Sequence, residues 1–153
     1  MAGTYSQLYV QIIFAVSGRE NLIAESWKHL LNKYIAGIIE AKGQKSIIVN
    51  GTADHIHCFV GLKPSMAVSN LTRDIKNNSS KFINENNFLS GKFKWQEGYG
   101  AFSYSQSSIP NVYSYILNQE EYHKRNSFKD EYLELLNKFQ IDFEPHYLFN
   151  WIE

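Results

Sequence analysis

Two histidines separated by a single residue, His55 and His57, are candidates to hold a divalent metal ion. Residues 55–62 (HIHCFVGL) have the composition of a β-strand, and alternate side chains of a strand share a face. Both imidazoles therefore point the same way, with Phe59 beside them, and form half of a metal site. A pair of half-exposed histidines on a sheet is the structural alternative.

A second polar set lies in the predicted helix 109–123, where Tyr115, Gln119 and His123 follow one another at intervals of four residues. This spacing places the three side chains in one stripe along the helix. A purely structural helix prefers apolar residues along a buried stripe, so this stripe indicates a polar partner. The alternative is a solvated face, because polar and charged residues lie nearby: Asn118, Glu120, Glu121 and Lys124.

Together the two sets could cleave a phosphodiester bond. A tyrosine hydroxyl has a reference pKa of about 10 and needs help to act as a nucleophile. A metal ion held by two histidines and a carbonyl oxygen could polarise the phosphodiester, and Gln119, one turn from Tyr115, could supply that oxygen. Tyr115 would then attack phosphorus and form a phosphotyrosine link that conserves the bond energy. The sequence shows no Walker-type phosphate loop, which agrees with a reaction that needs no ATP.

The elements that must position these residues follow the order β-α-β-β-α-β and then helices. Their patterns predict strands over residues 5–16, 44–50, 55–62 and 93–106, and helices over residues 24–42, 66–87, 109–123 and 127–138. We expect Gly43 to end the first helix and Ser65 to cap the second. The order is that of the ferredoxin-like fold, an α+β architecture with a four-stranded antiparallel sheet and two helices on one face. The other face remains available for a site, and the aromatic tail, residues 139–153, is expected to dock.

Length and composition indicate one domain over residues 1–153. Apolar residues make up 44% of the chain, enough for one sizeable core. The net charge is zero, with 15 Lys and Arg against 15 Asp and Glu, which argues against a protein that coats nucleic acid by charge alone. Cys58 is the single cysteine, as expected in a reducing compartment. We expect no signal peptide and no membrane span, which points to the cytoplasm.

The two polar sets match the motifs of a known family. One motif is histidine, hydrophobic residue, histidine (HUH), here residues 55–57 preceded by Asp54, and the other is Tyr-x-x-x-Gln, here residues 115–119. Residues 95–102, 118–123 and 128–132 also look like this family. The sequence therefore resembles the single-tyrosine HUH transposases, the small transposases of simple bacterial and archaeal insertion sequences, over nearly its whole length.

The resemblance implies a role for each matching residue. Tyr115 would be the nucleophile, and His55, His57 and Gln119 would bind Mg²⁺ or Mn²⁺. The products would be a 5′-phosphotyrosine and a free 3′-hydroxyl. The substrate would be single-stranded DNA with a hairpin at the end of the element. The protein would be a homodimer, in which the tyrosine helix of one subunit can complete the histidine site of the other.

Two neighbouring residues, His123 and Asp54, are candidates for an accessory role. The family often has two histidines after the glutamine, where this chain has Tyr122-His123. His123 could be a metal ligand, a proton shuttle or a phosphate contact, and its role stays open.

A basic and aromatic region is a candidate to bind the DNA strand. Five cations precede the aromatic segment 95–104: Arg73, Lys76, Lys81, Lys92 and Lys94. Basic side chains can follow the phosphates of unpaired DNA while aromatic rings stack on its bases. The alternative is a solvated helix face followed by a core strand, and we expect Trp95 and Phe102 to belong to the core.

Two other functions stay open. A ferredoxin-like module could bind nucleic acid without chemistry, but such modules carry aromatic residues on the open sheet face, where this chain has histidines. A domesticated relative or a replication or conjugation nickase would use the same site, although such proteins commonly have longer chains. The sequence therefore favours a transposase that cleaves and rejoins single-stranded DNA.

Overall fold

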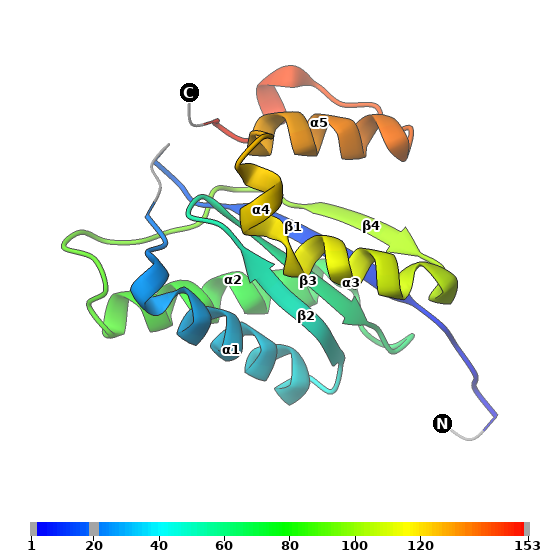
Figure 1. Cartoon of the computed structure of the whole chain (residues 1–153). Helices are drawn as coiled ribbons and strands as arrows, with labels where there is room; N and C mark the ends of the chain where they lie inside the picture. The colour runs from blue at the N-terminus through cyan, green and yellow to red at the C-terminus, as the bar shows by residue number, and fades with distance from the viewer. Residues whose placement is uncertain (1–2, 19–21, 152–153) are drawn as a thin grey trace.

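A computed structural model describes residues 3–18 and 22–151 and has the predicted α+β fold (Figure 1). Four strands form one antiparallel sheet in the order β2-β3-β1-β4, which confirms the ferredoxin-like topology. The strands are β1 (Tyr9–Ala15), β2 (Lys45–Gly51), β3 (His55–Gly61) and β4 (Gly100–Tyr104). The helices are α1 (Glu25–Ala41), α2 (Val68–Glu85), α3 (Ile109–Leu117), α4 (Gln119–His123) and α5 (Phe128–Lys138), with 3-10 turns η1 (Gln106–Ser108) and η2 (Pro145–Tyr147).

Helices α1 and α2 cover one face of the sheet, as predicted. They pack against alternate residues of β1 and β3: Ile12, Phe14, Ile56, Cys58 and Val60. The apolar stripe of α1 includes Leu31, Ile35 and Ile39, and all three are completely buried. Gly43 follows the end of α1 with a φ of 78°, a left-handed conformation that glycine adopts without strain.

The opposite face of the sheet, which the sequence left available for a site, is covered by α3, α4, α5 and the tail (Figure 1). Helix α3 packs through Val112 and Ile116 on Phe59 of β3. Helix α5 and the tail form a second apolar cluster with Ile13 and Phe102. A site on this face is therefore enclosed between the sheet and the C-terminal helices.

The tail docks on α5, as predicted, up to the last described residue. Phe149 is buried and packs against Phe128 and Tyr132, and Trp151 contacts the same two rings. The two final residues of the predicted docking segment, 152–153, lie outside the described part of the chain.

Two predicted boundaries on the α2 side are wrong. The predicted strand 93–106 is shorter, because Trp95 makes only an isolated bridge to Val16 and β4 begins five residues later. Trp95 and Phe102 nevertheless belong to the core, as expected. Ser65 does not cap α2, since the residue at the N-cap is Ala67, whose side chain accepts no hydrogen bond.

The predicted helix 109–123 is two helices, α3 and α4, which Asn118 separates. Asn118 has φ −97° and ψ 26°, outside the helical range. The side-chain amide of Asn50, in β2, donates to the carbonyl oxygens of Ile116 and Leu117 at 2.9 and 3.2 Å. These carbonyls lie at the end of α3, where a helix lacks internal donors, so β2 supplies the missing partner.

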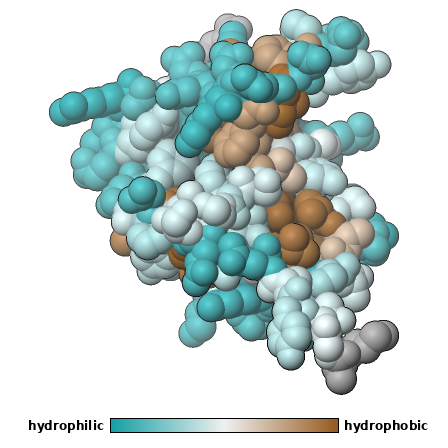
Figure 2. All heavy atoms as spheres, turned by 90° about the vertical axis from the view of Figure 1, so that its right-hand side faces the viewer, coloured by the Kyte–Doolittle hydropathy of each residue, from teal (hydrophilic) through white to brown (hydrophobic). Residues whose placement is uncertain are grey.

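Hydrophilic side chains cover most of the molecular face that Figure 2 shows, and hydrophobic ones gather there in small separate areas. Exposed apolar patches of limited size are usual for a globular protein. Among the helices of the described residues, none is long and apolar enough to cross a membrane.

The turn that leads into the histidine strand depends on a close backbone approach at Gly51. A Cβ at this position would lie 2.1 Å from the carbonyl oxygen of His55 and 2.9 Å from Cα of Ile56. We expect Gly51→Ala to lower the free energy of unfolding by about 1–3 kcal/mol, because the backbone must shift. Gly37 is the control, since open space surrounds it on the exposed side of α1, and Gly37→Ala should raise stability by about 0.5–1 kcal/mol. Urea denaturation measures both changes, and a Gly51→Ala protein as stable as the wild type would contradict the first.

Candidate active site

The two histidines of β3 lie side by side on the sheet face that the C-terminal helices cover. His55 and His57 are both 0% exposed, and their Nε2 atoms are 3.1 Å apart. Phe59 follows them on the same face and packs against α3. The alternative of two half-exposed histidines is therefore wrong, because α4 and α5 bury both rings.

The side chains of α4 reach the histidine pair. Gln119 is fully buried, and its Oε1 lies 3.0 Å from Nε2 of His55 and 3.1 Å from Nε2 of His123. The other ring nitrogen of His123, Nδ1, lies 2.7 Å from the carbonyl oxygen of Asn126, to which it donates. The structure thus brings together the predicted ligands His55, His57 and Gln119, with His123 at their edge.

A carboxylate that the sequence prediction missed, Glu131 of α5, lies at the centre of this cluster. Its Oε1 is 3.3 Å from Nε2 of each strand histidine and 3.1 Å from Nε2 of His123. Its Oε2 accepts hydrogen bonds from the Gln119 amide, at 2.9 Å, and from the Tyr115 hydroxyl. Glu131 therefore connects the predicted nucleophile to the histidines.

The sequence contained one signal for Glu131. Its neighbours on the buried stripe of α5 are Phe128, Tyr132 and Leu135, and Glu131 itself is 1% exposed. A carboxylate within the apolar stripe of an amphipathic helix is rarely buried without partners. The stripe could have identified Glu131 as a special residue, although it could not name the histidines that α5 meets across the fold.

The far side of the His55 ring is fixed by polar and aromatic neighbours. Oδ1 of Asp54 lies 2.7 Å from Nδ1 of His55, and the hydroxyl of Thr52 donates to the same oxygen at 2.9 Å. The ring of Phe128 stacks on the imidazole with a centroid distance of 3.9 Å. Asp54, a candidate for an accessory role, thus contacts His55 rather than the centre of the cluster.

The far nitrogen of the second histidine has a partner on β1. Nδ1 of His57 lies 2.7 Å from the side-chain amide nitrogen of Gln11, which is completely buried. The hydroxyl of Tyr104 donates to Oε1 of Gln11 at 2.8 Å. The group that contacts one ring nitrogen decides which nitrogen carries the proton. Gln11 therefore influences whether Nε2 of His57 presents a proton or a lone pair to the cluster.

The close charges shift the pKa values of the cluster. Burial lowers the pKa of His55, but hydrogen bonds to Asp54 and Glu131 outweigh it and raise this pKa to about 9. Burial also lowers the pKa of His57, and it lowers the pKa of His123 to about 4. Burial alone would raise the pKa of Glu131, yet His57 and His55 lower it to about 2. In the metal-free protein a cationic His55 therefore faces an anionic Glu131.

The donor atoms of the cluster are suited to a divalent cation. One ligand atom from each of His55, His57 and Glu131 lies within 4.8 Å of the others. Oε1 of Gln119 adds an amide oxygen beside them. Carboxylate and amide oxygens are usual ligands of Mg²⁺ and Mn²⁺, and imidazoles are usual ligands of several first-row divalent metals. The mixed set thus fits a divalent ion.

The five predicted DNA-binding cations do not lie at this cluster. Three of them belong to α2, which packs on the opposite face of the sheet: Arg73, Lys76 and Lys81. Lys76 donates to the carbonyl oxygens of Gln96 and Gly98 at 2.7 and 3.0 Å. Lys92 and Lys94 are exposed in the segment that precedes β4. A role in DNA binding stays a prediction for these residues, at a distance from the site.

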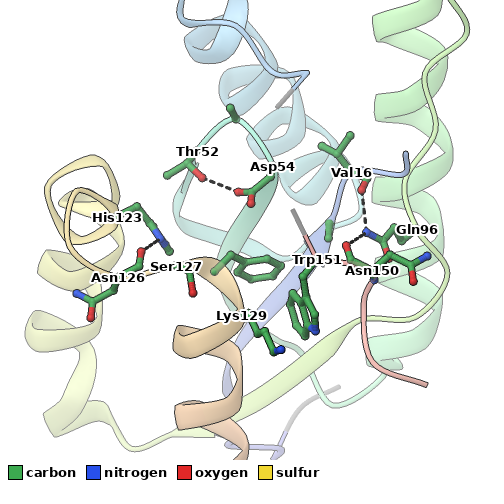
Figure 3. A pocket seen from close by; sticks show the side chains of 13 residues that line it. Val16, Thr52, Asp54, Gln96, His123, Asn126, Ser127, Lys129, Asn150 and Trp151 are labelled. Carbon is green, nitrogen blue, oxygen red and sulfur yellow. Dashed lines mark hydrogen bonds between the residues drawn. The ribbon is translucent and has the colours of Figure 1, made fainter. Parts of the chain in front are cut away.

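Two hollows open beside the cluster. The first, which we call the tail pocket, has a volume of about 320 Å³, and Figure 3 shows its side chains. Its lining includes Thr52, Asp54, His123, Phe128, Lys129 and Trp151. The second, which we call the tyrosine pocket, has a volume of about 310 Å³. Its lining includes Tyr104, Val112, Tyr115, Glu131, Leu135 and Lys138.

Comparisons with known proteins agree with this fold. The family model described as "Transposase IS200 like" matches residues 4–119. One similar solved structure comes from Deinococcus radiodurans R1 and is described provisionally as a transposase. Its TM-score is 0.63 and its sequence identity 18%, and the match covers 78% of this chain and 95% of that one. A REP-associated tyrosine transposase bound to a REP hairpin is similar with a TM-score of 0.59 and 14% identity, over 80% of this chain and 73% of that one. No curated protein sequence matches this chain.

The raised pKa of His55 predicts how stability depends on pH in the metal-free protein. A pKa raised from 6.5 to about 9 on folding adds stability below pH 6.5, and this stability is lost as the pH rises through 9. We expect the free energy of unfolding, measured in urea with a chelator present, to fall by about 3 kcal/mol over this window. Asp54→Asn should reduce the fall, because the Asp54 hydrogen bond is the largest cause that raises this pKa. If the free energy of unfolding falls equally with pH in the wild type and in Asp54→Asn, this account of His55 is wrong.

Proposed function

The chain belongs to the IS200-like transposase family, and from this premise we propose that it cleaves and rejoins single-stranded DNA through a covalent link to Tyr115. The observation that carries the proposal is the convergence of Tyr115, the two strand histidines and Gln119 on one buried cluster. A tyrosine, two imidazoles and an amide that meet from different elements are more than a folded core requires. Such a set matches the needs of phosphodiester transfer.

Tyr115 is the nucleophile in this proposal. Its hydroxyl points into the cluster and donates to Glu131, and its ring packs edge-on against His57 with a centroid distance of 5.8 Å. In the reaction the phenolic oxygen loses its proton and bonds to phosphorus. The bond from phosphorus to the 3′ oxygen breaks, and that oxygen takes up a proton. The products are a 5′-phosphotyrosine and a 3′-hydroxyl, and the reverse attack by a 3′-hydroxyl rejoins the strand.

His55, His57, Gln119 and Glu131 are the proposed ligands of Mg²⁺ or Mn²⁺. Such an ion, when bound, would polarise the phosphodiester and offset its negative charge. To act as a ligand, His57 must present the lone pair of Nε2, so its Nδ1 must carry the proton. The Gln11 amide must then turn its oxygen toward Nδ1 and its nitrogen toward Tyr104, an exchange that keeps both hydrogen bonds.

Access to this cluster requires a local movement. The two strand histidines and Gln119 are 0% exposed, and Glu131 is 1% exposed. His123 and Tyr115 are partly exposed, and each lines one of the two pockets. A phosphate can therefore approach the ligand atoms from either pocket once the side chain of Glu131 or His123 moves aside.

The proposed DNA partner is a strand with a hairpin at the end of an insertion sequence, handled in the cytoplasm. The REP-associated relative of this fold binds a REP hairpin, which supports a hairpin as the partner here. The cations of α2 and of the segment before β4 are proposed to contact this DNA outside the cluster. We also propose a homodimer. One chain already brings Tyr115 to its own histidines, so an exchange of the tyrosine helix between subunits is not needed to assemble the site.

The structure does not favour a binding module without chemistry. Modules of that kind present aromatic rings on an open sheet face. Here α3, α4 and α5 cover that face, and its centre holds a polar cluster.

Replacement of the nucleophile separates binding from cleavage. We expect Tyr115→Phe to bind single-stranded oligonucleotides from the sequences that flank the gene, but to form no covalent adduct with Mn²⁺ or Mg²⁺. Tyr113→Phe is the matched control, because Tyr113 is on the same helix and 40% exposed, and it should form the adduct as the wild type does. Denaturing gel electrophoresis with labelled DNA measures the adduct. An adduct in the Tyr115→Phe protein would show that another residue is the nucleophile.

Removal of a ligand tests the metal site without any DNA. We expect Glu131→Ala and Gln119→Ala each to weaken Mn²⁺ binding by at least about ten-fold, as measured by calorimetry. Glu134→Ala should leave the affinity unchanged, because Glu134 is exposed on the same helix as Glu131. Circular dichroism controls for folding. An unchanged affinity in Glu131→Ala would exclude this carboxylate as a ligand and leave the histidines and Gln119 as the site.

A further inference from the structure

The two pockets lie on opposite sides of the cluster along the elements that build it. On α5, Phe128 lines the tail pocket and Leu135 lines the tyrosine pocket, while Glu131, between them in sequence, points into the cluster. The same order holds along β3. Its first histidine stacks on Phe128, and its second packs against Tyr115. The histidines and Glu131 therefore separate one pocket from the other.

The geometry of in-line displacement indicates which nucleotide lies on the tail-pocket side of the cluster. The attacking and the leaving oxygen lie roughly in line across phosphorus in phosphoryl transfer. Tyr115 approaches the cluster from the tyrosine pocket, so the 3′ oxygen leaves toward the tail pocket. The nucleotide that carries this oxygen is the one on the 5′ side of the cleaved bond. This assignment rests on the proposed function, in which Tyr115 is the nucleophile.

The lining of the tail pocket suits an uncharged base better than a phosphate. Asp54 and Lys129 bring one negative and one positive charge to the lining, so a second anion would meet the Asp54 carboxylate. Asn150 also lines the pocket and has a side-chain amide, which can both donate and accept hydrogen bonds. The partly buried indole of Trp151 borders the same space (Figure 3). An aromatic side chain beside neutral polar groups is a common setting for an unpaired base.

We propose that the tail pocket binds the unpaired base of the nucleotide on the 5′ side of the cleaved bond, with Trp151 as its aromatic contact. The volume of about 320 Å³ is within the range of small-ligand sites, about 300–1,000 Å³. Binding of this base fixes the nucleotide whose 3′ oxygen leaves and later attacks. The tail thus contributes to substrate positioning as well as to the packing of α5.

A scan with abasic nucleotides tests the pocket. The probes are single-stranded oligonucleotides from the sequences that flank the gene, each with one abasic position, and their affinity for the Tyr115→Phe protein is measured by fluorescence anisotropy. At the nucleotide 5′ of the cleaved bond we expect the abasic site to weaken binding about ten-fold. When Trp151→Ala is added, intact DNA should bind about ten-fold more weakly, and the abasic site at this position should cause no further loss. Abasic sites elsewhere should weaken binding equally with and without Trp151.

A conservative variant keeps the test valid if the tail loosens. Trp151 packs against Phe128 and Phe149, so Trp151→Ala can disturb the tail. Trp151→Phe retains an aromatic ring. In this variant, the abasic site 5′ of the cleaved bond should still cause most of the loss of affinity seen with Trp151. The pocket proposal is overturned if no position couples to Trp151, or if the coupled position lies 3′ of the cleaved bond. The cleaved bond is mapped separately from the wild-type adduct, and the absence of any adduct would instead refute the proposed function.

Discussion

A buried carboxylate organises the C-terminal half of this protein. Glu131 is 1% exposed and contacts three imidazoles, the Gln119 amide and the Tyr115 hydroxyl. A carboxylate removed from water destabilises a fold unless charged and hydrogen-bonding groups surround it. Here each of its partners is a residue of the candidate active site. The contacts that make the burial of Glu131 tolerable are therefore the ones that assemble the site.

Packing on the sheet explains why these groups meet. The histidines point away from α1 and α2 because alternate residues of β3 belong to the core on that side. Two helices cover the apolar parts of the histidine face. Helix α3 packs on Phe59, and helix α5 packs on Ile13 and Phe102. Between them, the break at Asn118 turns α4 out of the line of α3 (Figure 1). The short helix α4 then places Gln119 against the histidines instead of continuing over the sheet.

Local patterns predicted most of this fold, whereas the site depends on contacts distant in sequence. Strand alternation predicted the shared face of His55 and His57. Helical spacing predicted that Tyr115, Gln119 and His123 would face a polar partner. Both patterns act within a single element. The partner of these residues, Glu131, belongs to another helix, and sequence spacing does not show which helix faces which strand. The break at Asn118 was missed for the same reason, because the side chain that stabilises it comes from β2.

The same arrangement bears on how the proposed DNA strand would reach the site. Space exists on both sides of the cluster, in the tail pocket and the tyrosine pocket. The carboxylate of Glu131 fills the position between Tyr115 and the histidines. Its Oε2 contacts the Tyr115 hydroxyl, and its Oε1 contacts the Nε2 atoms of His55 and His57. In the proposed reaction, a phosphate that enters this position displaces the Glu131 carboxylate from the Tyr115 hydroxyl, so the same movement releases the proposed nucleophile.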